Sequence, residues 1–201
     1  MTIDPTTTPV AAVYQALVGV VTPRPIAWVT TLSAQGTVNL APFSFFNAFG
    51  ANPPVVVFSP TLRRDGSKKD TLRNLERLGE FVVHSAVAPL AAAVNLTSRE
   101  LPPEESEVAL AGLSTVPSTR VRPPRIREAP TALECVVRQI IPCGTGPIAA
   151  NLVIGEVVLM HIADDLLDEH GGVDPRRLRT VARLGGAFWC HTSDLFELQR
   201  P

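Results

Sequence analysis

Both lysines of the chain lie in one short segment, residues 66–71, with the sequence Gly-Ser-Lys-Lys-Asp-Thr. Asp70 is expected to cap a helix over residues 71–78, which the following glycine would close. The start of a helix offers free backbone N–H groups and the positive end of the helix dipole, to which Lys69 adds charge and Thr71 adds a hydroxyl. Together these groups predict a site for a terminal phosphate. Taken alone, they are explained equally well by a solvated basic loop with ordinary helix capping.

Paired hydroxyls and a cluster of aromatic rings lie upstream of this segment. Thr30 and Thr31 end an expected strand over residues 26–32, and their hydroxyls could reach a phosphate or sugar oxygen without adding charge. Residues 43–49 hold four of the eight phenylalanines of the chain, with a serine and an asparagine among them. A planar heteroaromatic ligand needs such an apolar wall for its ring and a few polar groups for its edge. A hairpin with a phenylalanine-rich core is the alternative interpretation.

Other motifs indicate no competing chemistry. The sequence has no Gly-x-Gly-x-x-Gly that opens a helix, no Walker loop, no Gly-x-Ser-x-Gly and no His-Glu-x-x-His. Cys135, Cys143 and Cys190 are widely spaced without a Cys-x-x-Cys pair, so neither a disulfide framework nor a metal site is expected. His84 and His161 are interpreted as packed or capped residues of strands. The phosphate segment, the hydroxyl pair and the phenylalanines therefore favour a mononucleotide site, without a predicted catalytic residue.

Composition limits the class of protein. The chain has 201 residues, of which 45% are hydrophobic, enough for one domain over residues 1–201 with a substantial core. Its formal net charge is −1 and no segment is strongly basic, which argues against nucleic-acid binding. No stretch approaches the length of a membrane span, and the first residues show no signal-peptide pattern. We therefore expect a soluble, cytoplasmic protein without nucleic-acid or membrane partners.

The elements that would position the candidate residues are mainly strands. Apolar residues at helical spacing predict a short helix over residues 9–18. Six strands are predicted, joined by short helices and loops, without a regular alternation of strands and helices. A small antiparallel barrel, closed or partly open, fits this order, and Gly155 is expected to mark a bulge. The expected strands cover residues 26–32, a second one from 38, 55–59, 80–85, 132–141 and 148–162, and the further helices cover 71–78 and 89–96.

Five sequence blocks occur in the order known from one family. They resemble the flavin reductase-like proteins with an FMN-binding split barrel, which include flavoredoxins and the reductase components of two-component monooxygenases. The resemblance spans nearly the whole chain, and five ordered blocks are more specific than any one of them. The blocks are Pro-Arg-Pro-Ile-Ala-Trp-Val-Thr-Thr (23–31), Asn-Leu-Ala-Pro-Phe-Ser-Phe-Phe (39–46), Lys-Asp-Thr-Leu-Arg-Asn (69–74), Gly-Glu-Phe-Val-Val (79–83) and Arg-Leu-Gly-Gly (183–186).

The resemblance implies a six-stranded antiparallel Greek-key split β-barrel that forms a homodimer and binds FMN, or FAD, near the subunit interface. The threonine pair would face the ribityl phosphate, residues 43–47 would line the isoalloxazine, and residues 69–71 would hold the phosphate. By position, the implied cofactor-binding residues are Arg24, Thr30, Thr31, Ser44, Phe45, Phe46, Asn47, Ser59, Lys69, Asp70 and Thr71. The chain departs from the family at two places, where His84 replaces an expected asparagine and Phe188-Trp189 replace an expected tyrosine. The roles of these residues and of His191 stay open.

The same resemblance implies an oxidoreductase, because hydride chemistry resides in the flavin ring and needs no acid–base pair from the protein. The first hypothesis is an NAD(P)H:flavin oxidoreductase that passes reducing equivalents to free flavin or to a partner monooxygenase. The second is a flavoredoxin-like electron carrier with little nicotinamide activity, and the third is a barrel that binds another ligand. The phosphate segment and the paired threonines argue against the third. Nothing in the sequence separates the first two, since nicotinamide can bind transiently over a flavin without a dedicated motif.

Overall fold

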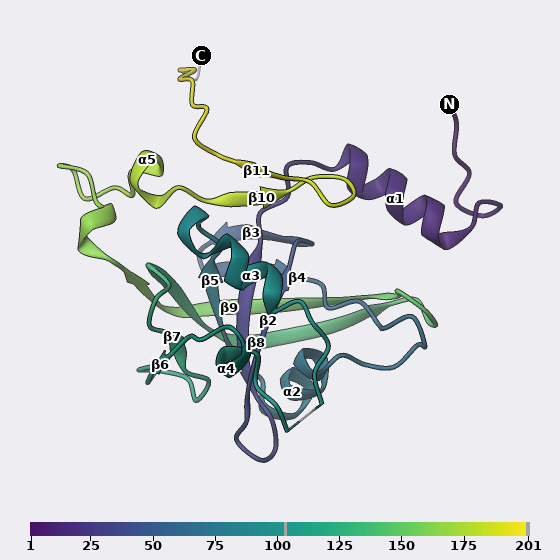
Figure 1. The fold of residues 1–201 in the computed structure, drawn as a ribbon, viewed down its shortest axis with the longest axis horizontal. Coiled ribbons are helices and arrows are strands. Elements are labelled where there is room, and N and C mark those ends of the chain that lie inside the picture. Colours follow the sequence, from purple (N-terminus) through teal and green to yellow (C-terminus); the bar gives the residue numbers. More distant parts are fainter. Residues whose placement is uncertain (103, 200–201) are drawn as a thin grey trace.

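The computed structural model describes residues 1–102 and 104–199, which form a mainly β fold with short helices in the connections (Figure 1). The helices are α1 (Val10–Val20), α2 (Asp70–Leu78), α3 (Ala91–Leu96), α4 (Glu107–Leu110) and α5 (Pro175–Leu178), with 3-10 turns η1 (Ala88–Leu90) and η2 (Asp164–Leu166). The strands are β1 (Ala27–Leu32), β2 (Val38–Phe43), β3 (Phe46–Ala51), β4 (Pro54–Phe58), β5 (Glu80–Ser85), β6 (Thr115–Val116), β7 (Arg125–Ile126), β8 (Thr131–Cys143), β9 (Ala150–Ile162), β10 (Val181–Arg183) and β11 (Trp189–His191). No helix in these described ranges is long and apolar enough to cross a membrane.

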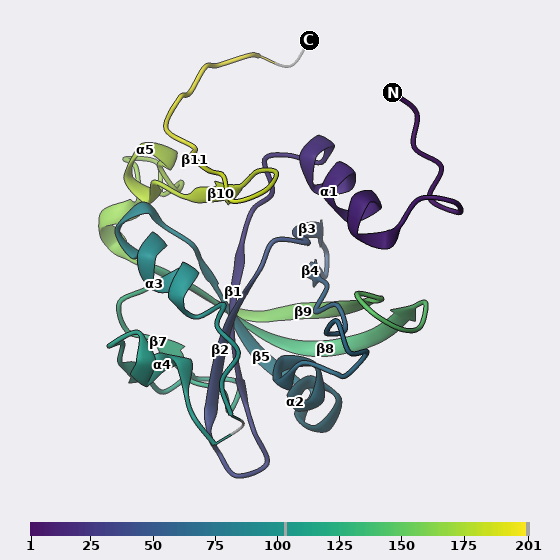
Figure 2. The same cartoon turned by 45° about the vertical axis from the view of Figure 1, so that its right-hand side comes forward.

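One antiparallel sheet organises the chain, with the strand order β2-β1-β5-β8-β9-β4-β3. Its strands change direction strongly, so that β1 and β2 run across the direction of β8 and β9 (Figures 1 and 2). The predicted class, a mainly β antiparallel split barrel, is confirmed. The sheet has seven strands rather than six, because the chain turns after Phe43 and residues Phe46–Ala51 return as β3, paired with β4 at the edge.

The inner face of this sheet encloses an apolar core. Phe58 lies at its centre, with its ring centroid 5.2 Å from that of Phe43 and 5.3 Å from that of Phe81. Leu75 from α2 is buried against the same cluster, so α2 closes one side of the core. Leu72 and Leu75, three residues apart on α2, are both buried, so one face of the helix docks on the sheet.

A second apolar layer lies on the other face of β1 and β2. Trp28 is buried there among side chains of α3, α4 and β7, while its neighbours Ala27 and Val29 face the inner core. The indole Nε1 of Trp28 donates a hydrogen bond of 2.9 Å to Thr97 Oγ1. Because successive strand residues face opposite sides, β1 is buried on both faces and holds the two layers together.

His84 links these layers from β5. Its imidazole is buried, with Nδ1 2.9 Å from the carbonyl oxygen of Trp28 and Nε2 3.0 Å from the backbone nitrogen of Ile126. Nε2 must accept the Ile126 N–H, so Nδ1 carries the proton and donates to Trp28. Burial lowers the pKa of His84 to about 4, and the neighbouring Arg125 adds to this effect. The histidine is therefore a neutral packed residue, as predicted.

The irregularity expected near Gly155 is present, although the extra residue belongs to the other strand. Val137 pairs with Gly155 and Gln139 pairs with Ile154, which leaves Arg138 of β8 as the bulged residue. A glycine is needed at position 155 for another reason, because the ring of Phe81 from β5 lies close to it.

Candidate functional site

The start of α2 presents unpaired backbone donors. Lys69 occupies the N-cap position and Asp70 is the first helical residue, so the prediction that Asp70 caps the helix is wrong by one position. Among the described residues no side chain caps this end, and the first backbone N–H to find a helical acceptor is that of Arg73, bonded to Lys69 O at 3.1 Å. The N–H groups of residues 70–72 are thus free within the described chain, as an anion site requires. At the other end, Gly79 closes the helix in the left-handed conformation, as predicted.

The two adjacent lysines have different surroundings. Lys68 is exposed, and its Nζ lies 2.7 Å from Glu76 Oε1. Lys69 is half-buried, its Nζ lies 5.8 Å from the centroid of the Phe43 ring, and it has no ion pair among the described residues. Burial lowers the pKa of the Lys69 ammonium; the nearby carboxylate of Glu100 opposes this shift without reversing it, and the charge of Arg63 adds to it. A half-buried ammonium without an ion pair is stabilised strongly when an anion binds beside it.

Asp70 and Thr71 complete the helix start. Burial raises the pKa of the Asp70 carboxyl, but hydrogen bonds from Arg63, at 2.8 Å, and from Arg73 outweigh this and keep the pKa below its usual value. The Asp70 charge is therefore neutralised within the chain. Thr71 Oγ1 accepts a hydrogen bond of 3.0 Å from Asn39 Nδ2, which leaves its hydroxyl proton able to donate to a ligand.

A cleft of about 100 Å³ opens at this helix start and is called here the α2 cleft. It runs between β2, α2 and the loop after α3. Its lining includes Asn39, Ala41, Pro42, Phe43, Arg63, Lys69, Asp70, Thr71, Thr97, Ser98, Arg99, Glu100, Leu101 and Glu107. Phosphate donors and the face of an aromatic ring therefore lie in one cleft.

A second cavity, of about 250 Å³, continues the α2 cleft along β2 and is called the tail cavity. The two share Pro42 and Ser98. The guanidinium carbon of Arg183 lies 5.1 Å from the centroid of the Trp189 ring in its wall. The tail cavity is lined by Tyr14, Ile26, Pro42, Ser44, Asn95, Ser98, Arg183 and Trp189. An elongated ligand with an anionic end and an aromatic end fits this combined shape.

The structure separates the predicted hydroxyl pair. Thr30 and Thr31 are both fully buried and lie on opposite faces of β1, because consecutive strand residues alternate. Thr30 Oγ1 donates to the carbonyl of Pro124 at 2.7 Å, whereas Thr31 Oγ1 accepts from Asn74 Nδ2 at 3.0 Å. They form no shared surface toward the α2 cleft, and this part of the sequence-based prediction is corrected.

The aromatic segment is also divided. Ser44 lines the tail cavity, but Phe45 packs edge-to-face on Tyr14, with ring centroids 6.2 Å apart. Phe46 begins β3 and packs against the inner core, and Asn47 is exposed, its side-chain oxygen accepting from the next backbone N–H. The predicted single wall is therefore reduced to Phe43 and Ser44, because the turn into β3 carries the other residues away.

Arg24 and Ser59 are held by other parts of the chain. Arg24 is buried and donates to the carbonyls of Val18 at 2.6 Å, Val21 at 2.8 Å and Leu184 at 3.1 Å. Ser59 Oγ, also buried, accepts from the backbone N–H of Asn151 at 3.2 Å. Neither residue lines the two cavities.

Several residues that line the cavities are not predicted from the sequence. Asn39 and Arg183 stand inside family-like blocks without a predicted role, and Arg63 and Arg99 lie in predicted loops. Tyr14 is the one signal that could have been used, because an exposed aromatic on an amphipathic helix often marks a binding surface. Nothing in the sequence spacing links these residues to one another.

Comparison with known proteins identifies similar chains. Residues 20–182 match the family model described as the flavin reductase like domain. An uncharacterized protein of Halalkalibacterium halodurans is 48% identical over 190 residues, which are 94% of this chain and 90% of that protein. Nitrilotriacetate monooxygenase component B from Bacillus cereus has a similar structure, with a TM-score of 0.92, 38% identity and 98% of each chain covered. The 2-nitrobenzoate 2-nitroreductase of Pseudomonas fluorescens gives a TM-score of 0.89 and 33% identity, covering 100% of this chain and 96% of that one.

Proposed function

Because this chain belongs to the flavin reductase-like family, we propose that it is a single-domain, cytoplasmic FMN-binding oxidoreductase that takes hydride from NADH or NADPH. One observation carries the proposal, namely the half-buried Lys69 without an ion pair among the described residues, beside the free N–H groups of α2. A ligand phosphate supplies the missing counter-charge and the missing acceptors together.

The residues present fit a flavin mononucleotide. Lys69, the hydroxyl of Thr71 and the first N–H groups of α2 would hold the phosphate. The tail cavity offers an aromatic wall in Trp189 and Tyr14 and a polar edge in Ser44. Bound flavin supplies the two-electron redox chemistry, and the chain orients it and limits the access of water. Arg24 positions this site indirectly, because its hydrogen bonds join the end of α1 to Leu184 beside the tail cavity.

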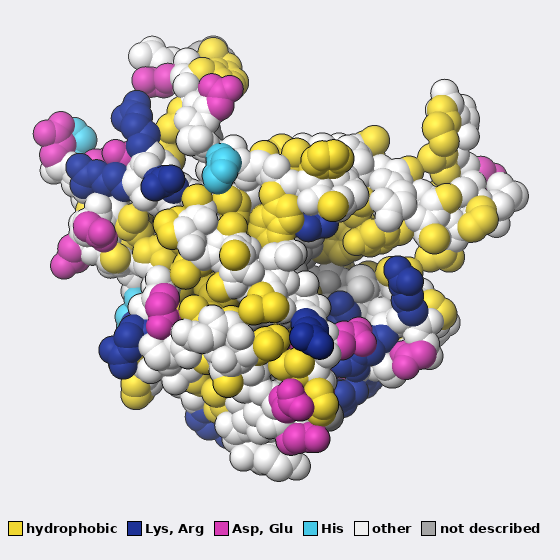
Figure 3. Space-filling view, viewed as in Figure 1, with side chains coloured by type: hydrophobic (Ala, Val, Ile, Leu, Met, Phe, Trp, Pro, Cys, Tyr) yellow, Lys and Arg dark blue, Asp and Glu magenta, His cyan; other side chains and the backbone are white. Residues whose placement is uncertain are grey.

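We further propose that the protein is a homodimer whose contact includes α1. This helix of 11 residues buries only Val18, although it is rich in apolar residues, and such a helix needs a partner. Figure 3 shows hydrophobic side chains gathered across the upper part of the molecule, over α1, β10 and β11. Tyr14 belongs both to α1 and to the tail cavity, so a second subunit over α1 would cover one side of that cavity.

The dimer is tested by measuring the molar mass with light scattering as the protein elutes from a size-exclusion column. Leu17 and Val20 are exposed on α1, at 48% and 78% of their full surface. Leu17→Glu with Val20→Glu is expected to give a monomer of unchanged circular dichroism, because buried charges without partners oppose association. A wild-type monomer at working concentration would contradict the proposal.

The relatives suggest two electron acceptors. Component B of nitrilotriacetate monooxygenase is named as one component of an oxygenase, which supports a role here in supplying reduced flavin to a partner monooxygenase. The nitroreductase relative supports direct reduction of a nitroaromatic compound as a second candidate. Oxidation of NADH with free FMN or with 2-nitrobenzoate as acceptor separates the two, since only the direct reductase consumes the nitro compound stoichiometrically.

An anaerobic absorbance titration tests the central proposal. The purified protein is mixed with FMN, separated from free cofactor, and titrated with NADH and then NADPH. Retained flavin that is rapidly bleached by either nucleotide is the expected result. A yellow protein that bleaches only with dithionite would instead establish the flavoredoxin-like electron carrier. A protein that retains no flavin and does not accelerate its reduction would exclude both functions.

A further inference from the structure

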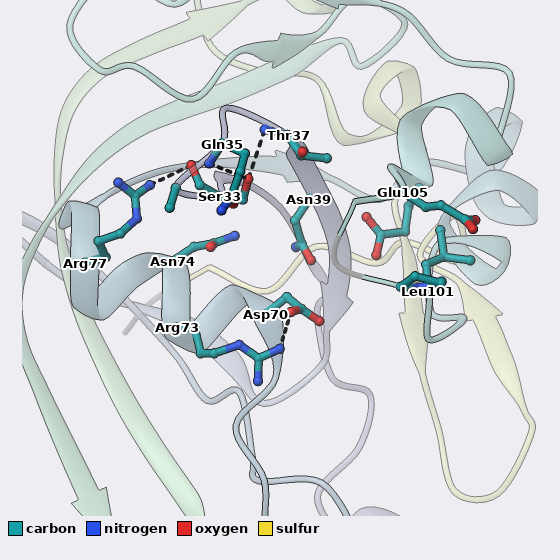
Figure 4. Close-up of a pocket in the computed structure, with 13 residues that line it drawn as sticks. Ser33, Gln35, Thr37, Asn39, Asp70, Arg73, Asn74, Arg77, Leu101 and Glu105 are labelled. Carbon is teal, nitrogen blue, oxygen red and sulfur yellow. Dashed lines mark hydrogen bonds and ion pairs between the residues drawn. The ribbon is translucent and has the colours of Figure 1, made fainter.

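A third cavity, of about 200 Å³, lies between the β1–β2 turn, the exposed face of α2 and the loop before α4 (Figure 4). We call it the hairpin cavity. Gln35 and Thr37 come from the turn, Arg77 from α2, and Glu105 and Glu107 from the opposite wall. Nothing in the proposed FMN site uses these side chains, apart from Glu107 at the border.

The three cavities follow one another along β2. Thr37 and Asn39 line the hairpin cavity, Asn39 to Phe43 line the α2 cleft, and Pro42 and Ser44 line the tail cavity. The seven steps from Thr37 to Ser44 span about 23 Å at roughly 3.3 Å per strand residue. This groove is longer than a mononucleotide needs, and its middle part is the helix start to which the proposed function assigns the phosphate.

The lining of the hairpin cavity is polar and holds charged side chains of both signs, among them the carboxylates of Glu105 and Glu107. Arg73 is paired with Asp70, and Arg77 donates to the carbonyls of Leu32 and Ser33 at 2.8 Å each. The remaining amide and hydroxyl groups can both donate and accept hydrogen bonds. Such a lining suits an uncharged group rich in hydrogen-bonding atoms, such as a nucleoside, better than another phosphate.

Glu107 adds a buried acceptor at the border with the α2 cleft. Its side chain is only 7% exposed, and the backbone N–H of Leu40 donates to Oε2 at 2.9 Å. Burial raises the pKa of this carboxyl, and the charge of Asp70 raises it further. Burial of a carboxylate costs free energy, and ligand N–H or O–H groups, such as an exocyclic amine or ribose hydroxyls, would offset that cost by donating hydrogen bonds to Glu107.

We propose that the hairpin cavity is the subsite for the adenosine half of FAD, whose diphosphate would lie at the start of α2. This inference rests on the proposed function and deepens it, because the same flavin site would then accept FAD as well as FMN. The nicotinamide dinucleotide is not the proposed occupant, because the flavin phosphate fills the start of α2 while NAD(P)H delivers hydride.

The test fills the cavity from its exposed wall. Glu105 and Glu104 are neighbouring exposed residues, of which only Glu105 lines the cavity. Glu105→Trp is compared with Glu104→Trp as the matched control, and Thr37→Trp fills the cavity from the opposite wall. Affinities for FMN and FAD are measured by flavin fluorescence, and KM and kcat for NADH and NADPH are measured with saturating FMN.

Glu105→Trp and Thr37→Trp are expected to weaken FAD binding by about tenfold, the loss that corresponds to one or two hydrogen bonds. The affinity for FMN, and the KM and kcat for NADH and NADPH with saturating FMN, should stay unchanged. Unchanged FAD affinity, an equal loss of FMN affinity, or equal losses with Glu104→Trp would overturn the inference. Failure of the wild type to bind any flavin would instead overturn the proposed function.

Discussion

The ring of Phe81 lies so close to Gly155 that a methyl group on that glycine would stand 2.3 Å from Cζ of the ring. Phe81 is fully buried in β5, and Gly155 lies in β9, on the far side of β8 in the sheet order. The contact therefore crosses the interior of the barrel rather than a strand pair. A glycine is required at this position because the aromatic ring occupies the space of a side chain.

Gly155→Ala is expected to destabilise the fold by about 1–3 kcal/mol through overpacking. The sign of the change in stability is informative, because replacing a glycine within a strand by alanine would otherwise stabilise the fold by roughly 0.5–1 kcal/mol. Urea unfolding measures the change. The pair Gly155→Ala with Phe81→Leu should cost less than the sum of the single changes, and strict additivity would show that the ring is not the cause.

His84 predicts a loss of stability on mild acidification. Its pKa is about 4 in the folded chain against 6.5 in the unfolded chain. Below pH 6.5 the His84 imidazole becomes protonated in the unfolded chain but stays neutral in the folded chain. The free energy of unfolding therefore falls as the pH is lowered toward 4. At about 1.4 kcal/mol per pKa unit the full loss is about 3 kcal/mol. Urea unfolding between about pH 7 and about pH 5 covers the range in which carboxylates contribute little.

The control for this pH dependence is a second histidine. His84→Asn keeps a donor and an acceptor side by side and removes the titration, so it should flatten the dependence. His170 is exposed, at 84% for its side chain, and His170→Asn should leave the dependence as in the wild type. An equally steep decline in His84→Asn would assign the effect to other groups.

Regular elements with strong local signals were predictable from the sequence. The helix over 70–78 has a polar helix start and a closing glycine, and the strand at 80–85 is centred on the apolar residues Phe81 to Val83, so both appear within a residue of their predicted bounds. By contrast, β3 is almost entirely exposed and shows no alternation of buried and exposed residues. Its strand character comes from pairing with β4, which local sequence does not encode.

The candidate site was predictable only in part. The position of Lys69 and Thr71 at the start of a helix was predictable, because the signals for a helix start are local in the sequence. The fate of Thr30 depends on the Pro124 carbonyl, 94 residues away, and the tail cavity joins Tyr14 to Trp189. Such long-range partners are set by the packing of the whole chain, which no short motif records.

Arg24 provides a prediction about the placement of α1. Its guanidinium donates to Val18 and Val21 at the end of α1 and to Leu184 beside the tail cavity. Arg24→Lys keeps the charge but cannot reach all three carbonyls, and each buried carbonyl left without a donor costs about 1–3 kcal/mol. Hydrogen exchange should therefore accelerate in α1 and around residue 184. Arg120→Lys, an exposed change without a side-chain hydrogen bond among the described residues, should alter neither segment.

The adjacent lysines allow the phosphate site to be tested with matched variants. Lys69→Ala removes the half-buried ammonium at the start of α2, whereas Lys68→Ala removes an exposed ammonium paired with Glu76. A charge-assisted hydrogen bond to phosphate contributes about 1.5–3 kcal/mol. FMN affinity, measured by fluorescence quenching, should therefore fall about 10- to 100-fold in Lys69→Ala and change by less than about threefold in Lys68→Ala.

The salt dependence of the same titration separates a direct contact from a general charge effect. Raising the ionic strength screens exposed charges more than partly buried ones. The difference in FMN affinity between wild type and Lys69→Ala should therefore persist at high salt, while any difference for Lys68→Ala should vanish. Thr71→Ala in the Lys69→Ala background should weaken binding further, because it removes the hydroxyl donor beside the same helix start. Equal affinities of the two lysine variants at every salt concentration would place the phosphate elsewhere.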